Sequence, residues 1–126
     1  MNETREKTIQ NYIDGYNEFD IEKMTRDLDE NIIFKNVQNE ETNLTLNGID
    51  AFKQQATEAK TYFESRQQKI TAINHFDDKT AIEIDYVAVL AMDLPNGLKK
   101  GQQLELKGKS IFRFRDNKII ELDDIA

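Results

Sequence analysis

A chain of 126 residues suffices for one domain, residues 1–126, whereas two cores would each fall near the lower size limit for independent stability. Hydrophobic residues make up 38% of the chain and charged residues 33%, a balance typical of folded globular proteins rather than of disordered ones. The formal net charge of −7 argues against binding to nucleic acid and to anionic membranes, since both require a positive surface.

Missing residue types exclude several kinds of site. The chain has no cysteine, which excludes disulfides, thiolate catalysis and cysteine metal sites. Its one histidine would leave a zinc ion dependent on carboxylates, so we expect neither a metal nor another cofactor. The first ten residues contain no apolar signal segment, and no apolar run approaches the roughly 20 residues needed to cross a bilayer. We therefore expect a cytoplasmic protein.

The first part of the chain predicts two successive helices. Over residues 3–19 the large apolar side chains recur with helical spacing and share one face: Ile9, Tyr12, Ile13, Tyr16 and Phe19. Gly15 costs this helix roughly 1 kcal/mol relative to alanine, which burial of the apolar face outweighs. Asp20 is a typical N-cap for a second, short helix, whose inner side carries Ile21, Met24 and Leu28.

The middle of the chain predicts a strand at residues 31–37, a strand fragment at residues 44–46 and a turn at Asn47-Gly48. Asp50 is predicted to cap a third helix, whose apolar positions are Phe52, Ala56, Ala59, Tyr62 and Phe63.

From residue 66 onward the helical period is lost, and strands are predicted at residues 66–76, 80–92, 103–115 and 118–125. The segments between them carry turn-forming residues, which favour antiparallel neighbours: Asp77-Asp78-Lys79, the loop 93–102 with Pro95-Asn96-Gly97, and Asp116-Asn117. Helices followed by a meander of strands indicate an α+β fold.

Alternation along these strands predicts which face is buried. In the strand at 80–92 one face carries Ile82, Ile84, Tyr86, Ala88, Leu90 and Met92. The opposite face begins with charged residues and then becomes apolar at Val87, Val89 and Ala91. A second apolar face needs a cover, and a homodimer packed sheet to sheet is the simplest one.

In the strand at 103–115 the inner face carries Leu104, Leu106, Ser110, Phe112 and Phe114. Gly108 interrupts this strand and predicts a bulge or a bend.

Three segments together resemble a known family. They are Ile9-Gln-Asn-Tyr-Ile13 with Asn17 and Asp20, Gly48-Ile-Asp-Ala-Phe52, and the ending from Phe112 to Glu121. In this order the chain resembles the nuclear transport factor 2-like superfamily, particularly its SnoaL-like and ketosteroid-isomerase-like branches. The resemblance covers essentially the whole chain. It implies a cystatin-like α+β roll, in which a cone-shaped, curved antiparallel sheet wraps around N-terminal helices, encloses a ligand cavity and dimerises through its outer face.

The ketosteroid-isomerase-like branch implies that Tyr12 donates a hydrogen bond to a developing oxyanion. Asn36 stands at the position of that branch's aspartate base, and Ser110 stands at the position of its second acid. Because an amide does not accept a proton near neutral pH, the isomerase reaction lacks its base.

SnoaL-like cyclases imply a catalytic carboxylate near the end of the last strand, where this chain has Asp124. Ile120, Leu122 and Asp124 share one strand face, so Asp124 is predicted to face the pocket. Apolar neighbours would raise its pKa and suit it to acid–base work. The alternative is a solvated side chain at the end of the chain. The histidine often found beside this carboxylate is replaced by Leu122, which weakens the cyclase interpretation.

Three functions stay open. The first is a SnoaL-like domain that binds an apolar or aromatic small molecule; its predicted contacts are Tyr12, Tyr16, Phe34, Asn36, Tyr86, Ser110, Phe112, Phe114 and Asp124. The second is a cofactor-independent enzyme, cyclase-, isomerase- or hydrolase-like, with Asp124 and Tyr12 as catalytic residues. The third is a non-catalytic dimeric interaction module. The missing partners of Asp124 favour binding over catalysis, and the fold alone does not decide between them.

Overall fold

The computed structural model describes residues 2–95 and 97–126, so Asn96 of the predicted turn lies outside the described residues. Helices precede most of the strands, as expected for an α+β fold. The elements are α1 (Asn2–Asn17), α2 (Ile21–Thr25), β1 (Leu28–Gln38), β2 (Glu41–Asn47), α3 (Ile49–Lys60), β3 (Phe63–His75), β4 (Lys79–Leu90), β5 (Gln103–Arg115) and β6 (Lys118–Ile125).

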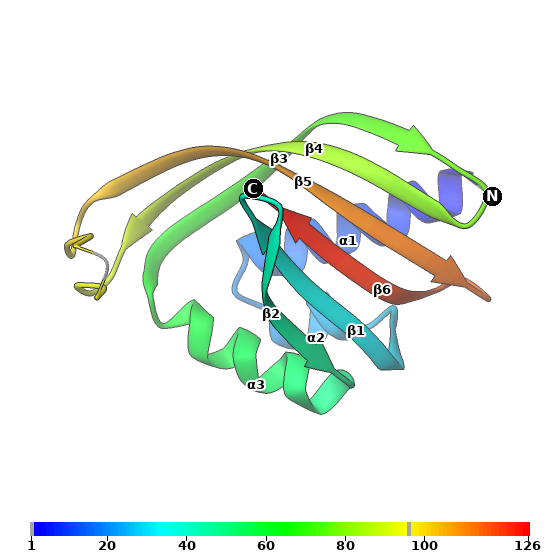
Figure 1. Cartoon of the computed structure of the whole chain (residues 1–126), viewed down its shortest axis with the longest axis horizontal. Coiled ribbons are helices and arrows are strands. Elements are labelled where there is room, and N and C mark those ends of the chain that lie inside the picture. The colour runs from blue at the N-terminus through cyan, green and yellow to red at the C-terminus, as the bar shows by residue number, and fades with distance from the viewer. Residues whose placement is uncertain (1, 96) are drawn as a thin grey trace.

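The strands form a six-stranded sheet in the order β2-β1-β6-β5-β4-β3 (Figure 1). The sheet curves without closing, and the helices pack against it, α1 on β3 and α3 on β1 and β2 (Figure 1). This arrangement confirms the predicted fold class. One pairing differs from the antiparallel pattern, since β1 and β6 run parallel. Hairpin turns fix the direction only of strands that are neighbours in the chain, and these two strands are separated by most of it.

The end of α1 positions the helix that follows it, α2. Phe19 has a left-handed backbone (φ 59°), which ends the helix at Asn17 instead of at the predicted Phe19. The Asp20 amide then donates to the Gly15 carbonyl at 2.8 Å, a typical C-terminal closure of a helix. A Cβ on Gly15 would lie 2.7 Å from the Met24 backbone nitrogen, so α2 packs this closely on α1 only because residue 15 is glycine.

Several predicted boundaries shift by a few residues. Leu28 opens β1 instead of ending the second helix, and Phe63 opens β3 instead of continuing the third. Gly48, with a φ of 94°, is the residue before α3, so Asp50 lies in the first helical turn and does not cap it. Met92 lies beyond the end of β4 and is 42% exposed, which removes it from the buried face.

Of the bulge or bend predicted at Gly108, the bulge lies elsewhere. Gly108 pairs with Ile84 in an unbroken register, so β5 has no bulge against β4 at this residue. The register between β5 and β6 shifts instead between Arg113 and Phe114. Because of this shift Ile119, rather than the predicted Ile120, is fully buried in the core, while Leu122 and Asp124 keep their predicted inward direction.

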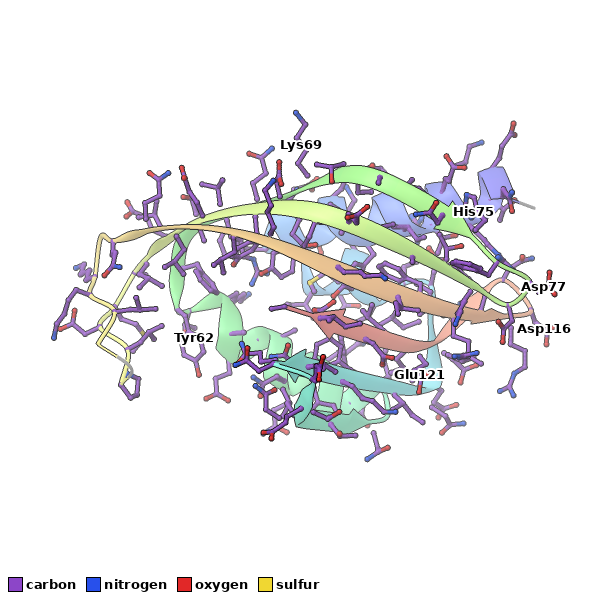
Figure 2. All side chains as sticks on the ribbon, turned by 45° about the horizontal axis from the view of Figure 1, so that its top comes forward. Tyr62, Lys69, His75, Asp77, Asp116 and Glu121 are labelled. Atoms are coloured by element: carbon purple, nitrogen blue, oxygen red, sulfur yellow. The ribbon has the colours of Figure 1, made fainter. Side chains whose placement is uncertain are left out.

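The outer face of the sheet is largely charged. Lys69 of β3 points away from the sheet, and the tips of two hairpins, at Asp77 and Asp116, lie at one end of it (Figure 2). Val87 is 41% exposed on this face and pairs with Gln67 on one side and Glu105 on the other.

None of the helices in the described residues has the length and apolarity that crossing a membrane requires.

Candidate functional site

Three polar side chains lie in one row across the inner face of the sheet. The parallel pairing of β1 with β6 sets Asn36 beside Asp124, and the antiparallel pairing of β6 with β5 sets Ser110 on its other side. The Ser110 hydroxyl donates a hydrogen bond to the Asp124 carboxylate at 2.8 Å. Asn36 and Ser110 stand at the positions of the two acids of the ketosteroid-isomerase-like branch. They therefore flank Asp124, which stands at the position of the carboxylate of SnoaL-like cyclases.

Two cavities open on this row. The first, here the helix-side cavity, has a volume of about 230 Å³ and lies between the sheet and the helices. The second, the strand-side cavity, has a volume of about 330 Å³ and extends over β4 and β5. Tyr16, Asn36 and Asp124 line both cavities. Asp124 therefore lies on the wall of both cavities and is partly buried, which agrees with the predicted inward direction and not with the alternative of a solvated chain end.

The environment of Asp124 favours its neutral form. Desolvation by burial raises the pKa of Asp124 to about 6, and the neighbouring charge of Asp123 acts in the same direction. The hydrogen bond from Ser110 opposes this rise only in part. A carboxyl group with this pKa holds or releases a proton close to neutral pH, which a solvated aspartate does not do.

The tyrosines of the site remain protonated at neutral pH. Tyr12 is 5% exposed, and burial together with the charge of Asp124 holds the pKa of its phenol well above its usual range. The hydroxyls of Tyr16 and Tyr86 lie 3.0 Å apart, and burial raises the pKa of both groups. The three phenols are therefore hydrogen-bond donors, with Tyr12 on the same cavity as Asp124.

The predicted phenylalanine contacts divide into two groups. Phe34 lines the helix-side cavity. Phe112 has no exposed surface and packs its ring against Tyr12, 5.7 Å between centroids. Phe114 lies beyond the register shift, beneath the guanidinium of Arg5 at 5.3 Å. The last two residues line neither cavity, so their predicted ligand contacts are corrected: Phe112 supports the wall from behind, and Phe114 packs at a distant end of the strand.

Other residues of the site were not anticipated. Small side chains of α3, Ala56 and Ala59, leave room in the helix-side cavity, and Leu44 and Leu46 of β2 form an apolar wall. Arg66 of β3 also lines it. Arg66, Gln68 and Ile70 occupy every second position of the strand and so share one face, and this pattern in the sequence could have indicated that Arg66 points inward. Across residues 2–95 and 97–126 no group of three or more histidine, cysteine, aspartate or glutamate side chains is placed to hold a metal ion.

Comparisons with known proteins point to one family. A family model described as "SnoaL-like domain" matches residues 9–122. A candidate polyketide cyclase from Xanthomonas campestris pv. campestris is similar in structure, with a TM-score of 0.82 and 21% identity over 98% of this chain and 90% of that chain. AclR, a candidate hydroxylase from Streptomyces galilaeus, has a TM-score of 0.76 and 16% identity over 95% of this chain and 86% of that chain.

A third structure, an NTF2-like protein of unknown function from Burkholderia pseudomallei, has a TM-score of 0.74 and 11% identity over 96% of this chain and 88% of that chain. A search of curated protein sequences gives no match. At these identities the solved structures establish the shared fold.

Asp124→Asn should stabilise the protein at neutral pH. The native carboxyl keeps its proton up to about pH 6, whereas the ordinary value is 3.8, so stability falls as the pH rises between these two values. This gap corresponds to about 3 kcal/mol, and we expect the variant to gain about 1–3 kcal/mol at pH 7.5, with the gain disappearing near pH 4. Urea unfolding of the wild type and the variant at pH 7.5 and pH 4 measures this difference in the free energy of unfolding.

The matched control is Asp50→Asn, which removes an exposed carboxylate from α3 and should give no such gain. A variant at position 124 that is less stable than the wild type at pH 7.5 would contradict the assignment of a desolvated acid.

Proposed function

The chain belongs to the SnoaL-like domain family, within the nuclear transport factor 2-like superfamily, and from this premise we propose that it binds a small, flat, apolar carbonyl compound in the helix-side cavity. One observation carries the proposal: the walls of this cavity are mostly apolar, and the one carboxyl group on them, that of Asp124, has a pKa of about 6. Ligand sites of this kind are mostly apolar, with a few polar groups that fix the orientation of the ligand.

The size of the cavity limits the ligand. Its volume of about 230 Å³ is below the roughly 300–1,000 Å³ typical of sites for drug-sized molecules, which favours one or two rings. The rings of Phe34 and Phe52 lie 5.6 Å apart at the wall, and flat apolar surfaces suit a flat ligand. The protonated Tyr12 phenol is a donor for a carbonyl oxygen.

A second function, proton transfer, is favoured by the pKa of Asp124. In this reaction the Asp124 carboxylate takes a proton from the carbon next to the ligand carbonyl. The electron pair of the broken C–H bond moves onto the carbonyl oxygen, and the Tyr12 hydroxyl stabilises the resulting enolate. Return of the proton from the Asp124 carboxyl group to carbon restores the carboxylate and the carbonyl group. The names of the similar structures, a candidate cyclase and a candidate hydroxylase, are consistent with chemistry at such a site.

Filling the cavity should abolish binding. Ala56→Phe places a ring in the helix-side cavity, whereas Gln54→Phe places the same ring on the exposed side of α3. With 2-tetralone, a two-ring ketone, at a hundred times its Kd, stabilisation of about 2.7 kcal/mol is expected, equal to a Tm increase of several degrees. Thermal unfolding should show this increase for the wild type and Gln54→Phe only. An equal increase for Ala56→Phe would refute binding in this cavity.

We also propose that the outer face of the sheet forms a homodimer around Val87, Val89 and Ala91. Val87 is the large apolar side chain that β4 leaves exposed on this face. The polar residues paired with it on both sides, Gln67 and Glu105, resemble the polar rim of an interface.

Light scattering coupled to size exclusion at micromolar concentration should give twice the chain mass of 14.7 kDa. Val87→Lys should reduce it to the mass of one chain, because a buried unpaired ammonium disfavours association. Gln54→Lys, on exposed α3 surface, should leave it unchanged. A wild type that elutes with the mass of one chain would disprove the dimer.

A further inference from the structure

Arg66 is a buried charge without a counter-ion. The side chain lies on the inner face of β3, and the residue is 5% exposed. Among the ion pairs of the described residues none involves Arg66. A buried guanidinium is costly unless an anion or several acceptors compensate for its lost hydration. The protein therefore keeps a charge in its interior that its own side chains do not neutralise.

Three aromatic rings hold the guanidinium in place. Its central carbon lies 3.7 Å from the ring centroid of Tyr16, 4.6 Å from that of Phe19 and 5.9 Å from that of Phe63. Stacking on ring faces is favourable for arginine and leaves the N–H groups in the plane of the guanidinium free for other partners. Phe19 contributes its ring from a left-handed backbone, a conformation that bulky residues rarely adopt.

The hydrogen bonds of Arg66 are incomplete. Nε donates to the Tyr16 carbonyl at 2.9 Å, which fixes the plane of the group against the end of α1. Nη2 is buried and has no hydrogen-bond partner. A purely structural arginine that joins α1 to β3 accounts for the Nε contact, but it accounts for neither the unpaired Nη2 nor the uncompensated charge. Buried donors are normally paired, so this one points to a missing partner.

The missing partner has a place in the cavity. Arg66 and Asp124 both line the helix-side cavity, and no ion pair joins them in the described residues. We propose that Arg66 is an anion-binding subsite of this cavity, and that the natural ligand is an aromatic or alicyclic carboxylate whose carboxyl group pairs with the guanidinium. This inference rests on the proposed binding function and names its ligand class. An arginine fixed in one plane is suited to a carboxylate, which accepts two parallel hydrogen bonds.

The subsite also gives the bound ligand a direction. Its anionic end lies at β3, on the guanidinium, and its ring system extends along the apolar walls towards the row that contains Asp124. The cation therefore orients the ligand, whereas the acid lies at the part of the cavity shared with the strand-side cavity.

A pair of probes that differ mainly in charge tests the subsite without any mutation. The probes are 2-naphthoate and its neutral counterpart 2-naphthamide, measured by isothermal titration calorimetry at pH 7.5. We expect the wild type to bind the carboxylate at least about tenfold more tightly than the amide. Equal affinities would overturn the subsite and leave the proposed binding function standing. Failure of both probes to bind would overturn both proposals.

Variants then assign the preference to one side chain. Arg66→Gln should remove the preference for the carboxylate and keep binding of the amide. Arg66→Lys, which retains the charge without the planar group, should keep part of the preference and serves if the first variant does not fold. Arg115→Gln, at an exposed position on β5, is the matched control and should bind both probes like the wild type. A tenfold preference that survives in Arg66→Gln would overturn the proposal.

Discussion

The attachment of α1 to the edge of the sheet sets the space in which the site lies. β3 is an edge strand, and the Asn17 side chain satisfies its free backbone at Gln68 by accepting from the amide at 2.8 Å and donating to the carbonyl at 3.1 Å. Arg66 adds the contact with the Tyr16 carbonyl. These bonds fix the end of the helix against one edge only, so the cavity lies between this fixed edge and α3 at the other, with Tyr12 and Tyr16 on its wall.

Local patterns in the sequence predicted the helices, the strands and most inward faces, because these features depend on neighbours in the chain. They did not predict the parallel pairing of β1 with β6, since no turn connects these strands. The shift near Arg113, which turns Ile119 inward in place of Ile120, likewise results from a mismatch between two strands that neither strand reveals alone. Gly108 was predicted to mark a bulge or a bend, and its unbroken register with β4 excludes the bulge there.

The same distinction applies to the site: local patterns predicted most of its residues, whereas contacts between distant segments were not predicted. Helical spacing on α1 turns Tyr12 and Tyr16 towards the sheet, and alternation along the strands turns the other predicted contacts inward. The helix-side cavity is therefore lined by Tyr12, Tyr16, Phe34, Asn36 and Asp124, and the strand-side cavity by Tyr86 and Ser110. Phe112 has the same direction, but tight packing by Tyr12 leaves it no exposed surface. Arg66 was missed because a charged residue is expected to point outward. Its inward position is supported by Phe63 of its own strand and by Tyr16 and Phe19 at the end of α1, which only folding brings to it.

The cavity thus joins a desolvated acid and an unpaired cation on apolar walls, and both reduce stability without a ligand. We propose that Asp124 accepts a proton from a bound carbonyl compound. The most direct measurement is proton NMR of the α protons of 2-tetralone in D₂O with folded wild type and with Asp124→Asn. We expect the wild type to exchange these protons for deuterium at least about tenfold faster than the variant. Equal rates for the two proteins would show that Asp124 does not transfer these protons.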